Sequence, residues 1–251
     1  MIESTNTQQQ KSFKILLVGD NCTDIYQFGT VDRLSPEAPI PVFVPSHTVE
    51  KAGMAGNVLM NLKALGCDVN FLCGHASKKT RLIDSRSKQQ IVRIDEDVKS
   101  TPIAIDSEIP NIYDAIVISD YNKGIVSYEL VEQLIATRKP IFVDTKKTDL
   151  ARFQGAWVKI NELEHSRLTS ECTGIITTLG SKGVRLWDEI YPSLPVEVAD
   201  VCGAGDTFLA ALAYQYLNTN SIEDAVKFAN KAASITVQHL GNYAPTLKEI
   251  E

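Results

Sequence analysis

The sequence predicts an α/β fold in which a mostly parallel sheet is covered by helices on both faces, giving three layers. Short apolar runs of strand length end in polar residues, and segments with helical periodicity follow several of them. With 44% hydrophobic residues and no linker or short repeat, the 251 residues are sufficient for one large core. We therefore expect a single domain over residues 13–251, after a polar tail at residues 1–12 that we expect to be disordered.

The first predicted strand, residues 13–19, is an apolar run that ends at Asp20, and Asp24 follows four residues later. Ligands of open α/β sheets bind at such strand ends, so both carboxylates are candidates for holding ligand hydroxyls. For Asp20, capping of the next turn is an equally good interpretation.

Residues 31–45, which include Arg33, carry four prolines among alternating apolar residues. This pattern favours an edge or lid strand over a central one. Helical periodicity begins near residue 49 and ends with Gly66 as the C-cap. Gly53, near its start, would let a ligand approach the backbone closely, with Asn57 pointing at that ligand. Close packing of the helix is the alternative explanation for the glycines.

Further strands are expected at residues 69–73, 115–118, 141–143, 156–160 and 175–178, followed by an antiparallel return at 184–187. Helices are expected at 128–137, 208–217 and 222–240. Asp120 and Lys123 are polar residues at one of these strand ends. The basic segment 77–93 contains Lys79, Arg81 and Arg93, which could bind a phosphate, although a solvated charged face is the ordinary explanation.

The segment 200–207, DVCGAGDT, precedes an apolar helix and carries the strongest chemical signal. Its small residues, Gly203, Ala204 and Gly205, leave backbone N–H groups uncovered at the positive end of the helix, where an anion can bind. Asp206, at the first helical position, would face the same anion. The combination indicates phosphoryl transfer, with Asp206 accepting a proton from a substrate hydroxyl. A tight turn followed by an Asp-capped helix is the alternative.

Composition excludes several other classes of protein. A net charge of −6 and a pI near 5.3 argue against nucleic-acid binding. Five cysteines without a C-x-x-C spacing argue against a disulfide framework or a zinc site and favour a reducing cytoplasm. We expect no membrane span and no secretory signal. Neither a P-loop nor a G-x-G-x-x-G sequence follows the first strand.

Several segments, taken in order, resemble the ribokinase-like (PfkB) carbohydrate kinases. The segments GDNCTD, RLSPEAPIPV, SDYNKG, VDTKKTDLARFQGA and ADVCGAGDT are most similar to one branch of the family, the heptose 7-phosphate kinase domains of bifunctional ADP-heptose synthases. The resemblance covers the chain from about residue 15 to its end. It implies a ribokinase-like fold, with lid strands within about residues 25–50 and 77–105. The implied reaction is ATP-dependent phosphorylation of D-glycero-β-D-manno-heptose 7-phosphate at O1.

The resemblance also implies site residues. Asp206 is then the catalytic base, with Gly203, Ala204 and Gly205 as the anion hole. The positions implied for ATP and Mg²⁺ are Asn161, Glu164, Thr178, Gly180, Gly183 and Asn230, with Glu164 acting on the metal through water. Asp24, Gly53 and Asn57 match sugar-binding positions, to which we add Asp20, Asp120 and Lys123 from the strand ends. Arg33, Lys79, Arg81 and Arg93 are candidate ligands for the phosphate of the sugar.

Three departures from the family pattern bear on function. Met54 stands where a glycine is usual, Cys202 replaces a common threonine, and about one βα unit is missing after Gly74. The departures leave two alternatives open: a kinase for another sugar or sugar phosphate, and a family member that binds nucleotide or sugar without turnover. The resemblance further implies dimerisation through the lid strands, and a separate nucleotidyltransferase for ADP-heptose formation.

Overall fold

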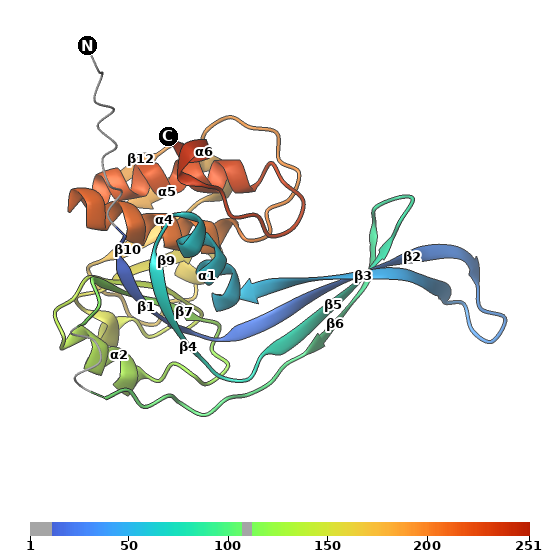
Figure 1. Ribbon diagram of the computed structural model, residues 1–251, viewed down its shortest axis with the longest axis horizontal. Coiled ribbons are helices and arrows are strands. Elements are labelled where there is room, and N and C mark those ends of the chain that lie inside the picture. Colours follow the sequence, from blue (N-terminus) through green and yellow to red (C-terminus); the bar gives the residue numbers. More distant parts are fainter. Residues whose placement is uncertain (1–11, 107–111) are drawn as a thin grey trace, which may run out of the picture.

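The structure is a computed structural model that describes residues 12–106 and 112–251. These residues form two sheets, a central sheet with helices on both faces and a smaller sheet that projects from it (Figure 1). The predicted α/β fold with a mostly parallel sheet is confirmed. The disordered tail predicted for residues 1–12 lies, except for Ser12, outside the described residues.

The central sheet has the strand order β12-β11-β10-β9-β8-β7-β1-β4. Neighbours from β4 to β10 pair in parallel, and β11 and β12 add an antiparallel edge, as predicted for residues 184–187. All six residues of β7 are buried, which suits a strand covered on both faces. The strands are β1 (Lys14–Gly19), β4 (Asp68–Cys73), β7 (Ala115–Asp120), β8 (Ile141–Thr145), β9 (Trp157–Asn161), β10 (Ile175–Thr178), β11 (Val184–Leu186) and β12 (Glu189–Tyr191).

Two groups of helices cover the two faces of this sheet (Figure 1). One face carries α1 (Ala55–Ala64), α4 (Ala204–Thr219), α5 (Ile222–Thr236) and α6 (Leu247–Ile250). The other carries α2 (Tyr128–Ile135) and the 3₁₀ turn η2 (Ala151–Phe153). Two single turns, α3 (Glu162–His165) and η3 (Gly180–Lys182), lie at strand ends. No helix among the described residues is long and apolar enough to cross a membrane.

Three predicted helix boundaries are wrong, and one of them is the start of α4, which begins at Ala204 rather than at residue 208. The helix predicted from residue 49 begins at Ala55, because residues 41–54 continue as a strand paired with residues 21–34. The last long helix ends at Thr236 rather than 240. There the Val237 carbonyl accepts hydrogen bonds from the N–H groups of Ala199 and Asp200, which takes it out of the helical ladder. Gly66 ends α1 as predicted, with a φ of 84° directly after the C-cap.

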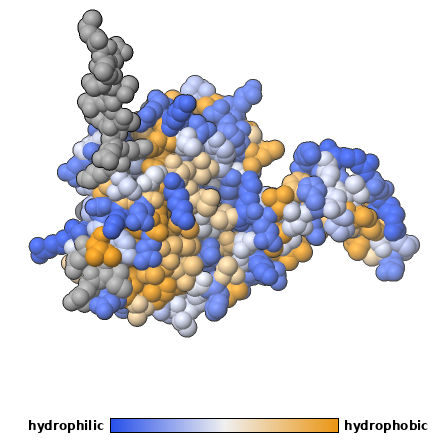
Figure 2. Space-filling model, viewed as in Figure 1, coloured by the Kyte–Doolittle hydropathy of each residue, from blue (hydrophilic) through white to orange (hydrophobic). Residues whose placement is uncertain are grey.

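The smaller sheet, which we call the lid, contains β2 (Asn21–Leu34), β3 (Pro41–Met54), β5 (Ser77–Asp84) and β6 (Gln90–Glu96). Its order is β3-β2-β5-β6, with β2 and β5 parallel and a hairpin on each side. Only residues 74–76 separate β4 from β5, so no helix is present where the sequence predicts a missing unit. The lid projects from the body as an arm (Figures 1 and 2).

Strand direction and register determine what meets at the base of the lid. The parallel strands β1, β7, β8, β9 and β10 bring their carboxyl ends to one side of the sheet. Within the lid, Asp24 pairs with Lys79, and Tyr26 pairs with Arg81, which pairs with Arg93. Because paired residues and residues two apart share a face, these side chains all lie on one face of the lid.

Candidate active site

The predicted anion-binding turn lies at the N-terminus of α4. Gly203 has a φ of 78°, a left-handed conformation that glycine adopts without steric cost, and the helix begins at Ala204. The Asp200 carboxylate braces the turn by accepting from the N–H of Cys202 at 3.0 Å and from the N–H of Gly241 at 2.9 Å. Since the first N–H groups of a helix have no partner within it, this turn can bind an anion.

Asp206 lies beside this turn, in the first turn of α4. It is the third helical residue rather than the first, because the helix already begins at Ala204. Its side chain is buried; Oδ2 accepts from Asn57 Nδ2 at 2.8 Å, and Oδ1 lies 3.3 Å from the Tyr121 hydroxyl. Burial raises the pKa of Asp206 to about 6, although the hydrogen bond from Asn57 lowers it. A carboxylate with a pKa in this range is suited to act as a general base.

A buried ion pair lies next to the turn. Lys159 Nζ, on β9, donates to Asp144 Oδ2, at the end of β8, at a distance of 2.6 Å, and both side chains are about 95% buried. Lys159 Nζ is also only 2.7 Å from the position that a side chain on Gly205 would occupy, so a cation borders the turn. Burial opposes ionisation of Asp144, but Lys159 and Lys146 outweigh it and lower the pKa of Asp144.

Sequence reasoning missed Lys159, Lys146 and Tyr121 as site residues. Lys159 offers a signal, because a lysine inside an otherwise apolar strand must find a buried partner. Lys146 lies just beyond the predicted strand 141–143, in a segment rich in lysine and threonine that carries no distinct signal. Tyr121 follows Asp120, and nothing in the sequence indicates that its hydroxyl reaches a residue 85 positions away.

Asn161 and Glu164 form a reciprocal capping box at α3. The Asn161 side chain accepts from the N–H of Glu164, and Glu164 Oε2 accepts from the N–H of Asn161, each at 2.8 Å. The other oxygen of Glu164 pairs with Lys146. Glu164 therefore fixes the end of β9 and, at the same time, forms an ion pair with Lys146.

A cavity of about 810 Å³ adjoins the turn. This volume lies within the range of small-molecule sites. Apolar residues such as Val196, Phe208 and Val237 form part of its wall, beside the polar ends of the strands. Most of the residues predicted to bind ATP line this single cavity: Asn161, Thr178, Gly180, Gly183 and Asn230, together with Gly203, Ala204, Gly205 and Asp206.

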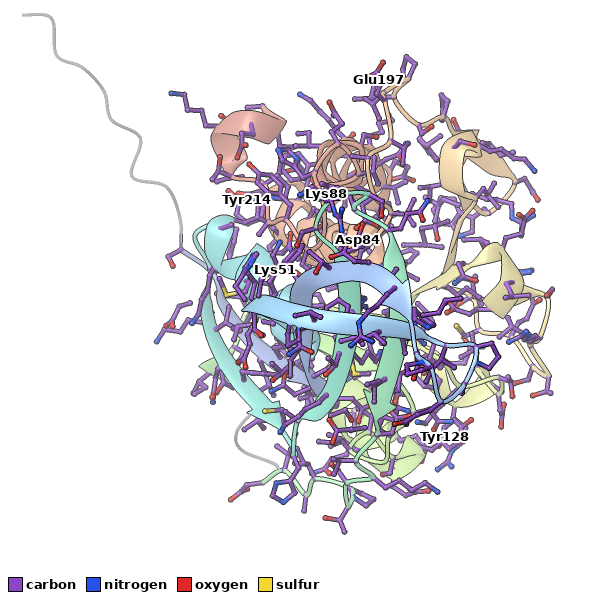
Figure 3. All side chains as sticks on the ribbon, turned by 90° about the vertical axis from the view of Figure 1, so that its right-hand side faces the viewer. Lys51, Asp84, Lys88, Tyr128, Glu197 and Tyr214 are labelled. Carbon is purple, nitrogen blue, oxygen red and sulfur yellow. The ribbon has the colours of Figure 1, made fainter. Side chains whose placement is uncertain are left out.

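The lid places a second polar cluster opposite the turn. Arg81 Nη1 donates to Asp24 Oδ1 at 2.6 Å and lies over the ring of Tyr26, 5.2 Å from its centroid. Asn242, which sequence reasoning missed, donates to Asp24 Oδ2 at 3.3 Å. Lys51, labelled in Figure 3, donates to the carbonyl of Asn242 at 3.2 Å and so joins β3 to the body.

The junction between β3 and α1 is crowded. A side chain on Gly53 would lie 2.2 Å from Asp24 Oδ2, so the space predicted for a ligand beside Gly53 is filled by that carboxylate. Met54 has a φ of 51° and a ψ of −132°, a conformation that favours glycine. Holding a methionine in this conformation costs on the order of 1–3 kcal/mol. Met54 itself is buried.

Other predicted sugar ligands are engaged within the protein. Asp20 Oδ2 accepts from the N–H groups of Tyr121 at 2.8 Å and Lys123 at 3.1 Å, so the capping interpretation describes this oxygen. Asp120 Oδ2 accepts from Thr145 Oγ1 at 2.7 Å and Lys147 Nζ at 2.8 Å. The side chain of Lys123 pairs with Asp97.

The predicted phosphate ligands on the lid lie at different depths. Lys79 Nζ lies 5.7 Å from the centroid of the Tyr121 ring, where the lid meets the central sheet. Arg93 pairs with Asp95 at 2.8 Å and is half exposed. Arg33 is exposed near the end of β2, beyond the residues that pair with β5. Lys79 and Arg81 thus lie near the site, and Arg33 does not.

Comparison with known proteins relates the chain to one family. The family profile of the pfkB family carbohydrate kinases matches residues 144–249. The chain is 32% identical to the bifunctional protein HldE of a Nitratiruptor species and 31% identical to HldE of a Helicobacter pylori strain, over 95% and 94% of its length. The chain therefore contains a pfkB carbohydrate kinase domain, and kinases of this family are phosphotransferases. It spans 64% and 65% of the length of these two relatives.

Solved structures of pfkB-type kinases share the fold. Arabidopsis thaliana ribokinase complexed with ribose and ATP aligns over 96% of this chain and 98% of its own, with a TM-score of 0.71 and 18% identity. Escherichia coli phosphofructokinase-2 in complex with potassium aligns over 96% and 97%, with a TM-score of 0.72 and 16% identity. The ribokinase-like fold is therefore confirmed.

The alignment with the Nitratiruptor relative contains more positions than this chain fills. The match to the Nitratiruptor relative extends over 299 residues, whereas 95% of this 251-residue chain is about 238 residues. The difference is about 60 residues, larger than the single βα unit that the sequence predicts to be missing. In this structure the lid strand β5 follows β4 after three residues, and both sheets still form.

The turn geometry generates a prediction for Gly203→Ala. A Cβ here would lie 2.8 Å from Asn57 Nδ2, the donor to Asp206, on a backbone with φ of 78°. We expect the strained backbone to cost on the order of 1–2 kcal/mol of stability and the displaced Asn57 to lower turnover strongly. Gly66→Ala is the matched control, because Gly66 has a φ of 84° with nothing within 4 Å.

Denaturant unfolding and steady-state ATP turnover would be measured on both variants. We expect both variants to lose a similar amount of stability and only Gly203→Ala to lose turnover. Equal turnover in the two variants would show that the turn does not depend on this contact.

Proposed function

We propose that this pfkB-family chain is an ATP-dependent sugar kinase in which Asp206 is the catalytic base. The observation that carries the proposal is the buried Asp206 carboxylate at the junction of the anion-binding turn, the 810 Å³ cavity and the lid. Its pKa, raised to about 6 by burial, keeps it ionised at neutral pH yet basic enough to accept a proton.

The reaction assigns a role to each part of the site. The sugar hydroxyl loses its proton to Asp206 while its oxygen forms a bond to the γ-phosphorus, and the bond from that phosphorus to the bridging oxygen of ADP breaks. The N–H groups of Gly203 and Gly205 stabilise the charge on the phosphoryl oxygens, joined by that of Ala204 in exchange for its 3.4 Å contact with the Val201 carbonyl. Lys159 and Lys146 add positive charge beside the same cavity.

The residues present are compatible with Mg²⁺. Mg²⁺ on a triphosphate keeps several waters and needs few protein ligands, so Glu164 could hold it through water. The residues described here contain no group of three acidic, histidine or cysteine side chains able to hold a metal alone, which agrees with a metal that arrives with the nucleotide. When bound, Mg²⁺ would neutralise charge on the β- and γ-phosphates. Glu164 would release Lys146 toward the same phosphates.

We propose D-glycero-β-D-manno-heptose 7-phosphate as the sugar, phosphorylated at O1. Two features support this choice: the relatives named HldE, and the basic side chains Lys79, Arg81 and Arg93 on the lid face that carries Asp24. Arg81 donates to Asp24 through Nη1 at 2.6 Å. Because a guanidinium has five N–H donors, Arg81 can hold this carboxylate and bind a phosphate at the same time. The strained Met54 at the edge of this site keeps another sugar phosphate as the alternative.

A panel of acceptors tests the proposal. ADP release would be measured with heptose 7-phosphate, heptose, fructose 6-phosphate, ribose, fructose and no sugar, using wild type and Asp206→Asn. We expect selective turnover of heptose 7-phosphate, and a loss of roughly 10²–10⁴-fold in Asp206→Asn with ATP binding retained.

Turnover of a different acceptor would contradict heptose 7-phosphate as the substrate but support the proposed kinase activity. ATP binding without turnover of any sugar would indicate the non-catalytic alternative instead. Near-normal turnover in Asp206→Asn would remove Asp206 from the role of base.

The pH dependence of kcat/KM follows from the ionisation of Asp206. Asp206 accepts a proton only when ionised, and burial raises its pKa from 3.8 to about 6. The value of kcat/KM should therefore be constant at neutral pH and fall as the pH drops through about 6. An acidic limb centred near the ordinary value for aspartate would contradict the assignment.

We further propose that the lid mediates a homodimer. Leu34, Val44, Val92 and Ile94 are large apolar side chains on the lid that are 45–66% exposed, and Figure 2 shows apolar residues among hydrophilic ones on the arm. Sedimentation velocity should show a dimer that Ile94→Glu weakens, whereas Ile190→Glu, 55% exposed at the central sheet, leaves it intact. A monomer at all concentrations, or equal effects of both variants, would refute the lid interface.

A further inference from the structure

The Asp206 carboxylate has one hydrogen-bond donor on each oxygen, and the proposed function uses only the carboxylate itself. Asn57, on α1, donates to Oδ2 at 2.8 Å, and Tyr121, directly after β7, donates its hydroxyl hydrogen to Oδ1 at 3.3 Å. Tyr121 lines the same cavity as Asp206. The two donors approach from different elements, so together they restrict rotation of the carboxylate.

Tyr121 is held in place by buried carboxylates at two neighbouring strand ends. Asp20, after β1, accepts from the N–H of Tyr121 at 2.8 Å, and Asp120, at the end of β7, accepts from the N–H of Asn122 at 2.8 Å. Both aspartates are at most 2% exposed. A buried carboxylate that is not bonded to solvent needs such donors, so the backbone on both sides of the Tyr121 side chain is fixed.

The Tyr121 ring also joins the two halves of the site. Lys79 of the lid and Lys146 beside the cavity both lie over this ring, with Nζ at 5.7 Å and 5.2 Å from its centroid. Cations over an aromatic face are attracted to it. The phenol therefore stands between groups that approach from the sugar side and from the phosphate side.

We propose that Tyr121 is a positioning residue for the base, whose hydroxyl holds Oδ1 of Asp206 so that the carboxylate keeps one orientation toward the sugar hydroxyl. This inference rests on the proposed function, in which Asp206 accepts the proton. The Tyr121 proton stays on the phenol throughout. The 3.3 Å separation is long for an O–H···O hydrogen bond, and catalytic hydrogen bonds are often long until substrate is bound.

The electrostatic surroundings of Asp206 agree with this role. Burial and the nearby Asp144 raise the pKa of Asp206, and the hydrogen bonds from Asn57 and Tyr121 lower it, as does Lys159. Removal of the phenol hydroxyl takes away one lowering contribution, so the pKa of Asp206 should rise. The other charged or titratable groups that face Asp206 are Lys146, which follows β8, and Cys202, which precedes α4.

Tyr121→Phe keeps the ring and removes only the hydroxyl, so it is the variant of choice. Tyr128→Phe is the matched control. Tyr128 begins α2 on the opposite face of the sheet from Tyr214 of α4 (Figure 3) and contacts Phe153 and two basic side chains. We expect kcat to fall about tenfold in Tyr121→Phe with little change in either KM, because a hydrogen bond to a charged group is lost. Tyr128→Phe should retain both parameters.

Carbon NMR of protein labelled at the aspartate carboxyl carbons reads the base directly, without turnover. The Asp206 resonance is assigned from its loss in Asp206→Asn. Its titration midpoint should move to higher pH in Tyr121→Phe, and the acidic limb of kcat/KM should move with it. The reverse effect should also be seen. The charge of Asp206 is the largest cause of the raised pKa of Tyr121, so Asp206→Asn should lower that pKa, and the phenol carbon resonance of Tyr121 would report it.

An unchanged Asp206 titration in folded Tyr121→Phe would overturn the inference, whatever the activity of the wild type. A shifted titration with unchanged kcat would also overturn it, because the hydroxyl would then not position the base. A shifted titration together with a wild type inactive on every sugar would support the contact and count against the proposed function.

Discussion

Burial of the Asp206 carboxylate is the constraint on which the arrangement of the site depends. A carboxylate removed from water is stable as an anion only with donors and cations around it, and Asp144 adds a second buried carboxylate nearby. The fold supplies Asn57 and Tyr121 as donors to Asp206, and Lys159 as a cation against Asp144. Burial outweighs these contributions and raises the pKa of Asp206 to about 6, a value that suits its proposed role as a base at neutral pH.

The parallel sheet makes this concentration of groups possible. Strands β1, β7, β8 and β9 are far apart in the sequence, yet their carboxyl ends lie side by side and deliver Asp20, Tyr121, Asp144 and Asn161 to one edge. The lid closes the opposite side with Asp24 and Arg81. The lid strand β5 follows β4 after only three residues, and all of these strand ends are nevertheless in place.

Local patterns in the sequence predicted the α/β class, the α4 turn and seven of the eight central strands, all but β12, because apolar runs and small residues before a helix are read over a few positions. The lid strands were expected from the family resemblance. Most of the residues that we assign to the nucleotide come from resemblance to the family. What the sequence could not provide were side-chain partners. Asn57 was expected to point at a ligand and instead donates to Asp206, and Asp20 holds a backbone turn. Such pairings depend on register and rotamer across long sequence distances, which no local pattern records.

The central claim is that Asp206 and its turn transfer the γ-phosphate of ATP to a sugar hydroxyl. Phosphorus NMR of a mixture of wild-type protein, Mg²⁺, ATP and heptose 7-phosphate tests this most directly. The account predicts loss of the γ-phosphate signal and growth of a second sugar phosphate resonance at the anomeric position, absent with Asp206→Asn. Growth of inorganic phosphate alone, or the same sugar phosphate resonance with Asp206→Asn, would contradict it.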